Sequence, residues 1–404
     1  MKRLCIVGAG YRGYYMFAKN LKENFKDEVK FVGVCDTNTM RSQYYVDTID
    51  KDMKLYTDFD LMLKEQKPDA VIVTTVDGYH HEYIIRALKA GFDVFSEKPI
   101  TIDEEKCALI RQAEKESGKK VTVTFNCRFM PYVVKIKEIL LSGVIGTPLT
   151  LNYEYTLNKL HGGDYFKRWH RFMKNSGGMM VHKATHHFDI INWLLEDDPV
   201  SVAAHGARLY YGNESVPHGE RCSTCEYASK CLSYEELITH EDEYNLYFAP
   251  EKLDGYVRDH CVFKADTDIY DCMSVSVEYA KGALLTYSLN LFSTEEGYNL
   301  NIVGNKGRIE ASTFFGDEKH NLIKIILNDG TENVLTFEKA SGTHGGGDIR
   351  MLKMLFGKDK IEDTLGQCAG SFDGIKSAMI GIAANQSIKE GIKINLKEKL
   401  DKML

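Results

Sequence analysis

The segment S-G-G-M-M-V-H-K-A-T-H-H-F-D, residues 176–189, is unusually rich in side chains that can transfer protons. Those side chains are His182, Lys183, His186 and His187. Apolar residues recur around them at helical spacing, so we expect one helix over residues 176–195. His182 and His186 are four residues apart and would share a face of that helix. The pattern indicates a helix that presents acid–base groups to a ligand, although a solvated helix face can have a similar composition.

The pair of histidines allows a second interpretation. Two histidines four apart on one helix are a spacing found among zinc ligands, so His182 and His186 could hold a catalytic metal. Gly177 and Gly178 stand at the start of the predicted helix, where they allow the backbone to approach a ligand closely. The identity of that ligand depends on the elements that the rest of the chain brings to this helix.

The N-terminal segment reads as strand, G-x-G-x-x-G, helix, strand and acid. The apolar run over residues 3–7 leads into Gly8-Ala9-Gly10-Tyr11-Arg12-Gly13, and a second strand over residues 31–35 ends at Asp36. In this arrangement the glycines allow a tight turn, close approach of a pyrophosphate and close helix packing. The helix N-terminus faces the phosphates, and the acid accepts hydrogen bonds from ribose hydroxyls. We therefore predict a dinucleotide site. The acid favours NAD, because a 2′-phosphate would meet a carboxylate, and Arg41 keeps NADP possible.

Strands and helices continue to alternate through the first third of the chain. We expect buried strands over residues 70–74, 94–95 and 121–125, and helices over residues 80–90, 101–117 and 131–141. Such alternation predicts a parallel sheet, and ligands bind beyond the carboxyl ends of its strands.

Polar residues follow several of these strands, and Lys98 in Glu97-Lys98-Pro99 is the most informative of them. A lysine desolvated at such an edge can have its pKa lowered to about 7–8, which suits proton transfer. The same tripeptide also occurs in ordinary surface turns. Thr75 and Arg128 follow neighbouring strands and point to the same edge.

Alternating strand patterns dominate the second half of the chain. They cover residues 149–155, 273–279, 283–291, 300–303 and 322–327. Residues 372–390 form an apolar helix pattern, and Asp348 is expected to cap a further helix. The predicted class is α/β plus α+β, with a Rossmann domain of parallel strands over residues 1–147 and a second domain over residues 148–404. The second domain should hold an open, mainly antiparallel sheet.

The composition excludes several classes of protein. The chain has 404 residues, 44% of them hydrophobic and 27% charged, which is typical of a soluble globular protein. The net charge of −7 gives no support for a nucleic-acid or anionic-membrane surface. No apolar run reaches the length of a membrane span, and no signal peptide is recognisable. We expect a cytoplasmic protein.

The ten cysteines are then expected to be mostly reduced. Cys222, Cys225 and Cys231 form C-x2-C-x5-C inside an insertion over residues 212–262, and Cys261 could complete four ligands. Tetrahedral thiolate sites are typical of structural zinc, with an iron–sulfur cluster as the alternative. Coincidental thiols in a loop would give the same spacing.

Together these motifs resemble the Gfo/Idh/MocA family of oxidoreductases, typified by glucose–fructose oxidoreductase and inositol 2-dehydrogenase. The residues that carry the resemblance are Gly8–Gly13, Asp36, His80, Glu97-Lys98-Pro99 and Arg128. The resemblance implies that Lys98 reaches both cofactor and substrate, and that subunits pair through the open sheet face. It also implies an acid–base role for His186. In the family pattern an aspartate usually stands where this chain has His182, so either imidazole could carry the proton.

The resemblance and the motifs together define an expected site. The expected cofactor contacts are Gly8, Gly10, Tyr11, Arg12, Gly13, Asp36, Arg41, Thr75, His80, Glu97, Lys98 and Arg128. The expected substrate contacts are Lys98, Tyr155, His161, Tyr165, Arg168, Trp169, His182, Lys183, His186 and His344. Aromatic side chains mixed with arginine and histidine suit a sugar, whose ring offers C–H faces and hydroxyls.

The leading hypothesis is an NAD-dependent dehydrogenase that acts on a hydroxyl of a sugar, glycoside or cyclic polyol. An alternative keeps NAD but cleaves glycosides without net oxidation, through a transient keto-sugar. A third is a non-catalytic protein that senses NAD or a sugar. The expected partners are a carbohydrate substrate and further copies of the chain, as a dimer or tetramer.

Overall fold

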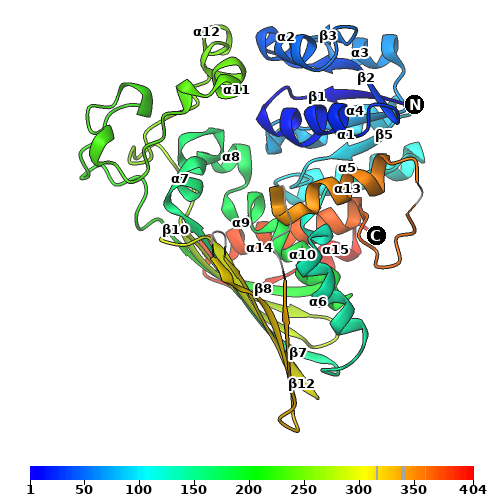
Figure 1. Ribbon diagram of the computed structural model, residues 1–404, viewed down its shortest axis with the longest axis vertical. Coiled ribbons are helices and arrows are strands. Elements are labelled where there is room, and N and C mark those ends of the chain that lie inside the picture. Colours follow the sequence, from blue (N-terminus) through cyan, green and yellow to red (C-terminus); the bar gives the residue numbers. More distant parts are fainter. Residues whose placement is uncertain (315–316, 338–342, 360) are drawn as a thin grey trace.

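The computed structural model describes residues 1–314, 317–337, 343–359 and 361–404, and its two sheets lie one above the other in Figure 1. In the described residues the first sheet has seven strands in the order β15-β6-β5-β4-β1-β2-β3. Its strands are β1 (Lys2–Val7), β2 (Val29–Cys35), β3 (Lys54–Tyr56), β4 (Ala70–Val73), β5 (Asp93–Ser96), β6 (Val121–Val123) and β15 (Ala369–Gly370). All pairs are parallel except β15 with β6.

The strand order reverses at β1, which pairs with β2 on one side and with β4 on the other. A crevice opens at such a switch point, beyond the carboxyl ends of the strands. The helices that follow these strands are η1 (Gly13–Lys19), α1 (Asn20–Asn24), α2 (Thr39–Thr48), α3 (Phe59–Gln66), η2 (Asp77–Tyr79), α4 (His80–Lys89), α5 (Glu104–Ser117), η3 (Asn126–Phe129) and α6 (Pro131–Leu141). The predicted parallel Rossmann sheet is confirmed. Helix α5 begins later than expected, because the Asp103 side chain accepts the Lys106 amide and caps the helix there.

The second sheet has nine strands in the described residues, in the order β14-β13-β12-β11-β7-β10-β9-β8-β16. They are β7 (Pro148–Asn158), β8 (Pro199–Ala207), β9 (Cys272–Tyr279), β10 (Leu284–Ser293), β11 (Gly297–Gly304), β12 (Gly307–Phe314), β13 (Asp317–Leu327), β14 (Glu332–Thr336) and β16 (Ile394–Asn395). Only β7 and β10 pair in parallel among these described strands. Along β9 and β10 every second side chain is buried, as expected for a sheet with one covered face. The mainly antiparallel second sheet is confirmed.

A layer of helices lies between the two sheets. Helix α14 (Ser371–Glu390) contacts α10 (Thr185–Leu195), β8 of the second sheet, and β6 and β15 of the first (Figure 1). Because one helix packs against both sheets, it ties the two halves of the chain together. Helix α13 (Gly347–Phe356) begins one residue before Asp348, so the predicted cap at Asp348 is wrong; the cap position is Gly346. The short helix α15 (Lys397–Asp401) ends the chain.

The single helix predicted over residues 176–195 is also wrong. The structure has three pieces, α8 (Met173–Ser176), α9 (Met179–His182) and α10, with Gly177 and Gly178 at φ values of 68° and 72°. Between α9 and α10 the His186 amide donates to the Lys183 carbonyl, not to that of His182. The i→i+4 ladder is therefore interrupted beside the histidines, and the His182 carbonyl is left available.

The insertion over residues 212–262 consists of short turns and helices. They are η5 (Cys222–Thr224), η6 (Ala228–Lys230), η7 (Leu237–Thr239), α11 (Glu241–Glu243), η8 (Tyr244–Phe248) and α12 (Glu251–Asp254). Helices α11 and α12 lie beside α2 of the Rossmann domain (Figure 1). Asp242 accepts hydrogen bonds from the hydroxyls of Tyr15 and Tyr44, and Asn38 donates to the Pro250 carbonyl at 3.0 Å. The insertion is thus docked onto the nucleotide-binding half of the chain.

None of the helices that the structure describes has both the length and the apolar composition needed to cross a bilayer. Helices α7 (Lys159–Lys167) and η4 (Trp169–Arg171) follow β7 and carry much of the predicted substrate site, and η9 (Thr343–Gly346) precedes α13.

Candidate active site

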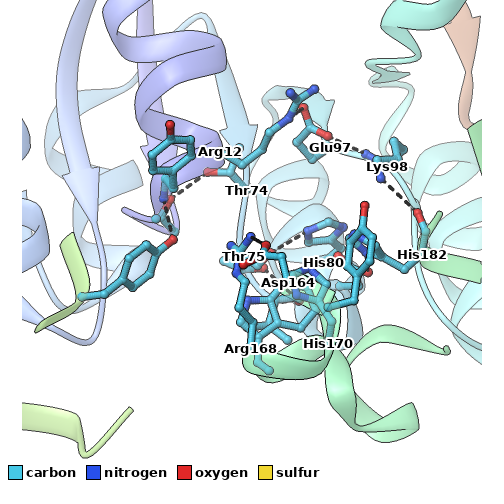
Figure 2. Close-up of a pocket in the computed structure, with 18 of the residues that line it drawn as sticks. Arg12, Thr74, Thr75, His80, Glu97, Lys98, Asp164, Arg168, His170 and His182 are labelled. Carbon is cyan, nitrogen blue, oxygen red and sulfur yellow. Dashed lines mark hydrogen bonds and ion pairs between the residues drawn. The ribbon is translucent and has the colours of Figure 1, made fainter. Parts of the chain in front are cut away.

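A cavity of about 600 Å³ lies between the Rossmann strands and helices α7, α9 and α10. Figure 2 shows part of its lining, with Arg12 and Glu97 on one side and His182 across from Lys98. Most of the predicted site residues line it: Gly8, Gly10, Tyr11, Arg12, Asp36, Arg41, Thr75, His80, Glu97, Lys98, His161, Tyr165, Arg168, Trp169, His182, Lys183, His186 and His344.

The glycine-rich turn closes one end of the cavity. Gly8 has φ +90° and a Cβ there would lie 2.6 Å from the Thr74 backbone, so only glycine fits without strain. A Cβ on Gly13 would lie 2.6 Å from the Thr74 hydroxyl, which accounts for its role as a packing residue outside the cavity lining. The turn therefore has the close approach between backbone and helix that dinucleotide binding requires.

Asp36 lies at the end of β2, where its carboxylate accepts the amides of Ala9 at 2.7 Å and Asn38 at 2.8 Å. Arg41 lies beside it but is neutralised by the insertion: its Nη1 is 2.7 Å from the Asp254 carboxylate and 3.8 Å from that of Asp36. The Nη2 atoms of Arg12 and Arg41 are buried without a partner in the described residues. These unpartnered donors, with the glycine turn, fit a bound dinucleotide.

Two insertion tyrosines also reach the cavity. The Tyr247 hydroxyl accepts the Tyr11 amide at 2.8 Å, directly beside the glycine turn. Tyr256 lines the cavity with it, and the Arg41 guanidinium lies over both rings, 5.8 Å and 5.7 Å from their centroids. The insertion thus forms one wall of the nucleotide end.

Lys98 lies at the centre of the site. Its Nζ donates to the His182 carbonyl at 2.9 Å, across the cavity from the strand that carries it (Figure 2). Burial lowers the pKa of Lys98 to about 8, and the nearby carboxylates of Asp77 and Glu97 partly oppose that shift. Glu97 is itself held by the Arg12 Nε at 2.9 Å. An amine in this position can change protonation state near neutral pH.

His182 pairs with a residue that sequence reasoning did not select. Its Nδ1 is 2.6 Å from the Asp77 carboxylate, and both groups are buried. Burial lowers the pKa of His182 well below its usual range, and the Lys98 ammonium lowers it further. Burial raises the pKa of Asp77. The lowered pKa of His182 and the raised pKa of Asp77 both favour the uncharged forms of the two side chains. The imidazole is held in one orientation by the carboxylate.

His186 offers an unpartnered nitrogen. Its Nδ1 is buried and has no hydrogen-bond partner in the described part of the chain. Burial lowers the pKa of His186 well below its usual range, with the positive charge of Lys98 as the next cause. His186 lines the cavity, and the charge of Lys98 acts on it, so its neutral imidazole can accept a proton from a bound hydroxyl.

The structure does not bring Arg128 to the cavity, so its predicted cofactor contact is not supported. Its guanidinium forms a fork with Asp189, at 2.8 Å to one carboxylate oxygen and 2.6 Å to the other. Both side chains are buried, and the third guanidinium nitrogen donates to the Gly366 carbonyl at 3.1 Å. Asp189 follows His186 by three positions, and its carboxylate belongs to this structural pair.

Tyr155 likewise lies outside the cavity lining. Its ring stacks on His187 with centroids 4.2 Å apart, and His187 in turn bonds the Tyr287 hydroxyl at 2.7 Å. This aromatic stack supports the floor of the site from β7 and β10. A direct contact of Tyr155 with substrate is therefore not supported.

Helices α7 and η4, with Arg168 between them, present a charged and aromatic wall. Arg168 pairs with Asp164 at 3.0 Å, and Trp169 stacks on His170 with centroids 3.6 Å apart. His161 lies 3.0 Å from the Tyr165 hydroxyl through its Nε2. The pairing of flat rings with charged groups suits a polyhydroxylated ligand. His344 lies at the opposite side and bonds Asp348 at 3.1 Å.

Several lining residues were missed from the sequence: Thr74, Val76, Asp77, Asp164, His170, Tyr247, Asp254 and Tyr256. Asp77 was recognisable as a residue just beyond the carboxyl end of β4. Tyr247, Asp254 and Tyr256 carried no motif, because the insertion meets the site only through tertiary contacts.

The metal expectations are not supported. Across the described residues the structure holds no group of three or more His, Cys, Asp or Glu side chains able to bind a metal ion. The three cysteines of the loop lie in or beside the turns η5 and η6. Cys225 and Cys231 are among the groups that act on the Cys261 thiol, and Cys261 acts on that of Cys222, but the described side chains form no group able to hold a metal ion. His182 and His186 fall on separate helical pieces, and Asp77 occupies the His182 Nδ1.

Comparison with known families covers nearly all of this chain. Residues 2–125 match a family described as an oxidoreductase family with an NAD-binding Rossmann fold. Residues 137–396 match the C-terminal alpha/beta domain of the same oxidoreductase family. The first match contains strands β1 to β6 of the first sheet, and the second contains every strand of the second sheet together with β15.

Individual relatives agree with these matches. The chain is 34% identical to the oxidoreductase YteT of Bacillus subtilis (strain 168), over 98% of each chain. It is 31% identical to the scyllo-inositol 2-dehydrogenase (NAD(+)) of the same organism, over 51% of this chain and 58% of that enzyme. The WlbA dehydrogenase from Bordetella pertussis, solved with NADH and UDP-GlcNAcA, has the same fold, with a TM-score of 0.68 at 18% identity and 98% coverage of both chains.

Proposed function

The chain belongs to the Gfo/Idh/MocA oxidoreductase family, and on this premise we propose that it oxidises a hydroxyl of a sugar or cyclic polyol with NAD. The observation that carries the proposal is Lys98, buried in one cavity with the glycine turn, with its Nζ 2.9 Å from the His182 carbonyl. That position places one amine within reach of both a nucleotide and a second ligand. The similarity to an NAD-dependent inositol dehydrogenase supports this substrate class.

Gly8, Gly10 and Arg12 would hold the pyrophosphate of NAD, and Asp36 would bind its ribose. The bound cofactor supplies the hydride acceptor. The chain's own residues then handle the proton. His186 takes the hydroxyl proton on its neutral imidazole, and the Lys98 ammonium stabilises the negative charge that develops on the substrate oxygen. Asp77 and His182 act as positioning residues that fix the far side of Lys98.

The first experiment is an assay of NADH formation by its ultraviolet absorbance, with the whole chain, NAD and a panel of sugars, glycosides and polyols. Net NADH formation with a sugar or polyol is the expected result. Glycoside cleavage without NADH accumulation would instead support the redox-neutral alternative. Binding of NAD and sugar with no turnover of either kind would support a sensor and contradict the proposed oxidation.

We expect the His186→Ala variant to lose about 10²-fold in kcat with little change in KM. The variant removes the proton-accepting imidazole while Lys98 and the binding walls stay in place. His182 offers a second imidazole that limits the loss. Steady-state NADH formation measures the effect. His205→Ala removes an exposed histidine on β8 and should leave kcat unchanged. Equal activity of wild type and His186→Ala would exclude His186 as the proton acceptor.

We expect the Asp254→Asn variant to shift cofactor preference toward NADP by about tenfold in the ratio of kcat/KM values. Asp254 neutralises Arg41 at 2.7 Å, and the freed guanidinium could then bind a 2′-phosphate. Asp36 keeps part of the preference for NAD. Glu241→Gln, an exposed change in the same insertion, serves as the control and should leave the ratio unchanged. An unchanged ratio for Asp254→Asn would contradict this role.

A further inference from the structure

Lys183 is a buried cation without a counter-charge. Its side chain lines the cavity and the residue is only 9% exposed. Its ammonium has no hydrogen bond and no ion pair within the part of the chain that the structure describes, and it lies over the Tyr155 ring, 5.1 Å from the Nζ to the ring centroid. A buried, unpaired charge is costly, so this ammonium favours an anionic partner.

The other cations along the cavity are already paired. Arg12 meets Glu97 at 2.9 Å, Arg41 meets Asp254 at 2.7 Å, and Arg168 meets Asp164 at 3.0 Å. Lys98 bonds a carbonyl and lies near two carboxylates. Lys183 differs from all of them, because the described protein provides no partner for its charge.

The carboxylate whose charge acts on Lys183 is engaged by other groups. Glu296 is among the charges that act on Lys183, but one of its oxygens is 2.7 Å from His161 Nδ1 and the other accepts the Asn158 amide at 2.7 Å. Both contacts come from the start of α7 and fix the carboxylate there. An anion that pairs with the Lys183 ammonium must therefore come from a ligand.

Lys183 lies at the reacting end of the cavity. It follows His182, whose carbonyl binds Lys98, and it precedes His186 by three residues across the break between α9 and α10. Its charge also acts on both Lys98 and His186. The ring beneath it belongs to β7 of the second sheet, on the far side from the glycine turn.

We propose that Lys183 binds a carboxylate of the substrate, so that the preferred substrates are acidic sugars or polyols, such as uronates and aldonates. This inference rests on the proposed oxidation of a sugar hydroxyl and specifies the substrate class of that same site. The carboxylate lies close to the carbon that is oxidised, because its ammonium partner is a neighbour of Lys98 and His186.

A carboxylate suits this position better than a phosphate. Phosphate carries nearly two negative charges at pH 7 and is usually bound by several donors at once, commonly a forked arginine or a helix N-terminus. Here one ammonium is free, and the Arg12 guanidinium, whose charge acts on Lys183, is engaged by Glu97. One free positive charge matches one carboxylate.

The test compares matched neutral and acidic substrates with the whole chain and NAD. Glucose is paired with glucuronate and gluconate, galactose with galacturonate, and glucose 6-phosphate represents phosphorylated sugars. The wild type should oxidise the best acid with a kcat/KM about 10- to 100-fold above that of its neutral partner, which is the factor of one charge-assisted hydrogen bond. The gain should be mainly in KM.

Lys183→Met removes the charge with little change in volume and should bring the acid-to-neutral ratio close to one. Lys183→Arg keeps the charge and should retain most of the ratio. Lys174→Met removes an exposed lysine from the preceding helix and should leave the ratio as in the wild type. Affinity for NADH, measured by fluorescence titration, should be similar in all four proteins.

Several outcomes would overturn the inference and leave the proposed oxidation intact. They are neutral sugars used as well as acids by the wild type, a preference for the phosphorylated sugar, or a Lys183→Met variant that loses NADH affinity while its acid-to-neutral ratio persists. The wild-type ratio and the Lys183→Arg variant keep the test decisive if Lys183→Met does not fold. Absence of NADH with every substrate would instead contradict the proposed function itself.

Discussion

Replacement of Lys98 by alanine is expected to lower kcat for hydroxyl oxidation by about 10²- to 10⁴-fold. The variant loses the only lysine amine that the described structure bonds to the His182 carbonyl, and with it the charge that stabilises the developing alkoxide. The substrate walls formed by α7 and η4 remain, so KM should change less than kcat. Steady-state NADH formation with the best substrate gives the measurement.

The pH profile provides a readout that a merely structural role of Lys98 would not change. Burial lowers the pKa of Lys98 to about 8, so the ammonium is present below that pH and is lost above it. We therefore expect kcat/KM for oxidation to fall as the pH rises through about 8. Lys98→Arg keeps its charge throughout this pH range. Its kcat/KM should be lower than that of the wild type but should not fall as the pH rises through about 8. A rate that rises through the same pH would show that Lys98 acts as a neutral base, which contradicts our assignment.

The Asp189→Ala variant is expected to lose about 3–5 kcal/mol of unfolding free energy. It leaves the Arg128 guanidinium buried without its carboxylate, in a place where both side chains are no more than 3% exposed. The pair joins η3 to α10, so its loss should loosen the layer between the two sheets. Urea unfolding at neutral pH should show a lower midpoint with an unchanged slope.

Two further variants identify the cause of that loss. Asp198→Ala removes an ion pair with Lys376 at the surface, where the Asp198 side chain is 61% exposed. The loss of unfolding free energy should be no more than about 1 kcal/mol. The double variant Arg128→Met, Asp189→Leu replaces the buried pair with apolar side chains and should recover most of the stability. If Asp189→Ala unfolds at the same urea midpoint as the wild type, the Arg128–Asp189 pair does not stabilise the helix layer between the two sheets.

The sequence predicted the first sheet well, because parallel strands covered on both faces appear as short, continuous apolar runs. The runs at residues 70–74 and 121–125 became β4 and β6 within two residues of the expected ends. Helix α6 began at Pro131 as expected, because proline is tolerated at the first turn. The two-residue strands β15 and β16 have no periodicity of their own and are defined only by their partners.

The site was predicted where one short motif carried the chemistry. The glycine turn, Asp36 and Lys98 needed only local spacing. Local spacing does not predict contacts between residues that are far apart in the sequence. Asp77 and His182 are 105 positions apart, and Asn38, whose side-chain amide bonds Asp254, is 216 positions from it. Arg128 illustrates the opposite error. A polar residue at the edge of the sheet could face either the cavity or the core, and a buried carboxylate on α10 decided the outcome.

Because of the break between α9 and α10, the backbone and the side chain of residue 182 have separate partners. The carbonyl accepts a hydrogen bond from Lys98, and the imidazole pairs with Asp77. The carbonyl that anchors Lys98 is free because the His186 amide bonds the Lys183 carbonyl instead. Any residue at position 182 presents that same carbonyl, as long as the chain turns in the same way. The side chain can therefore be exchanged, aspartate for histidine, to tune acidity and substrate choice without moving the lysine. The anchor of the Lys98 amine is a property of the local chain path, and the side chain beside it is free to diverge.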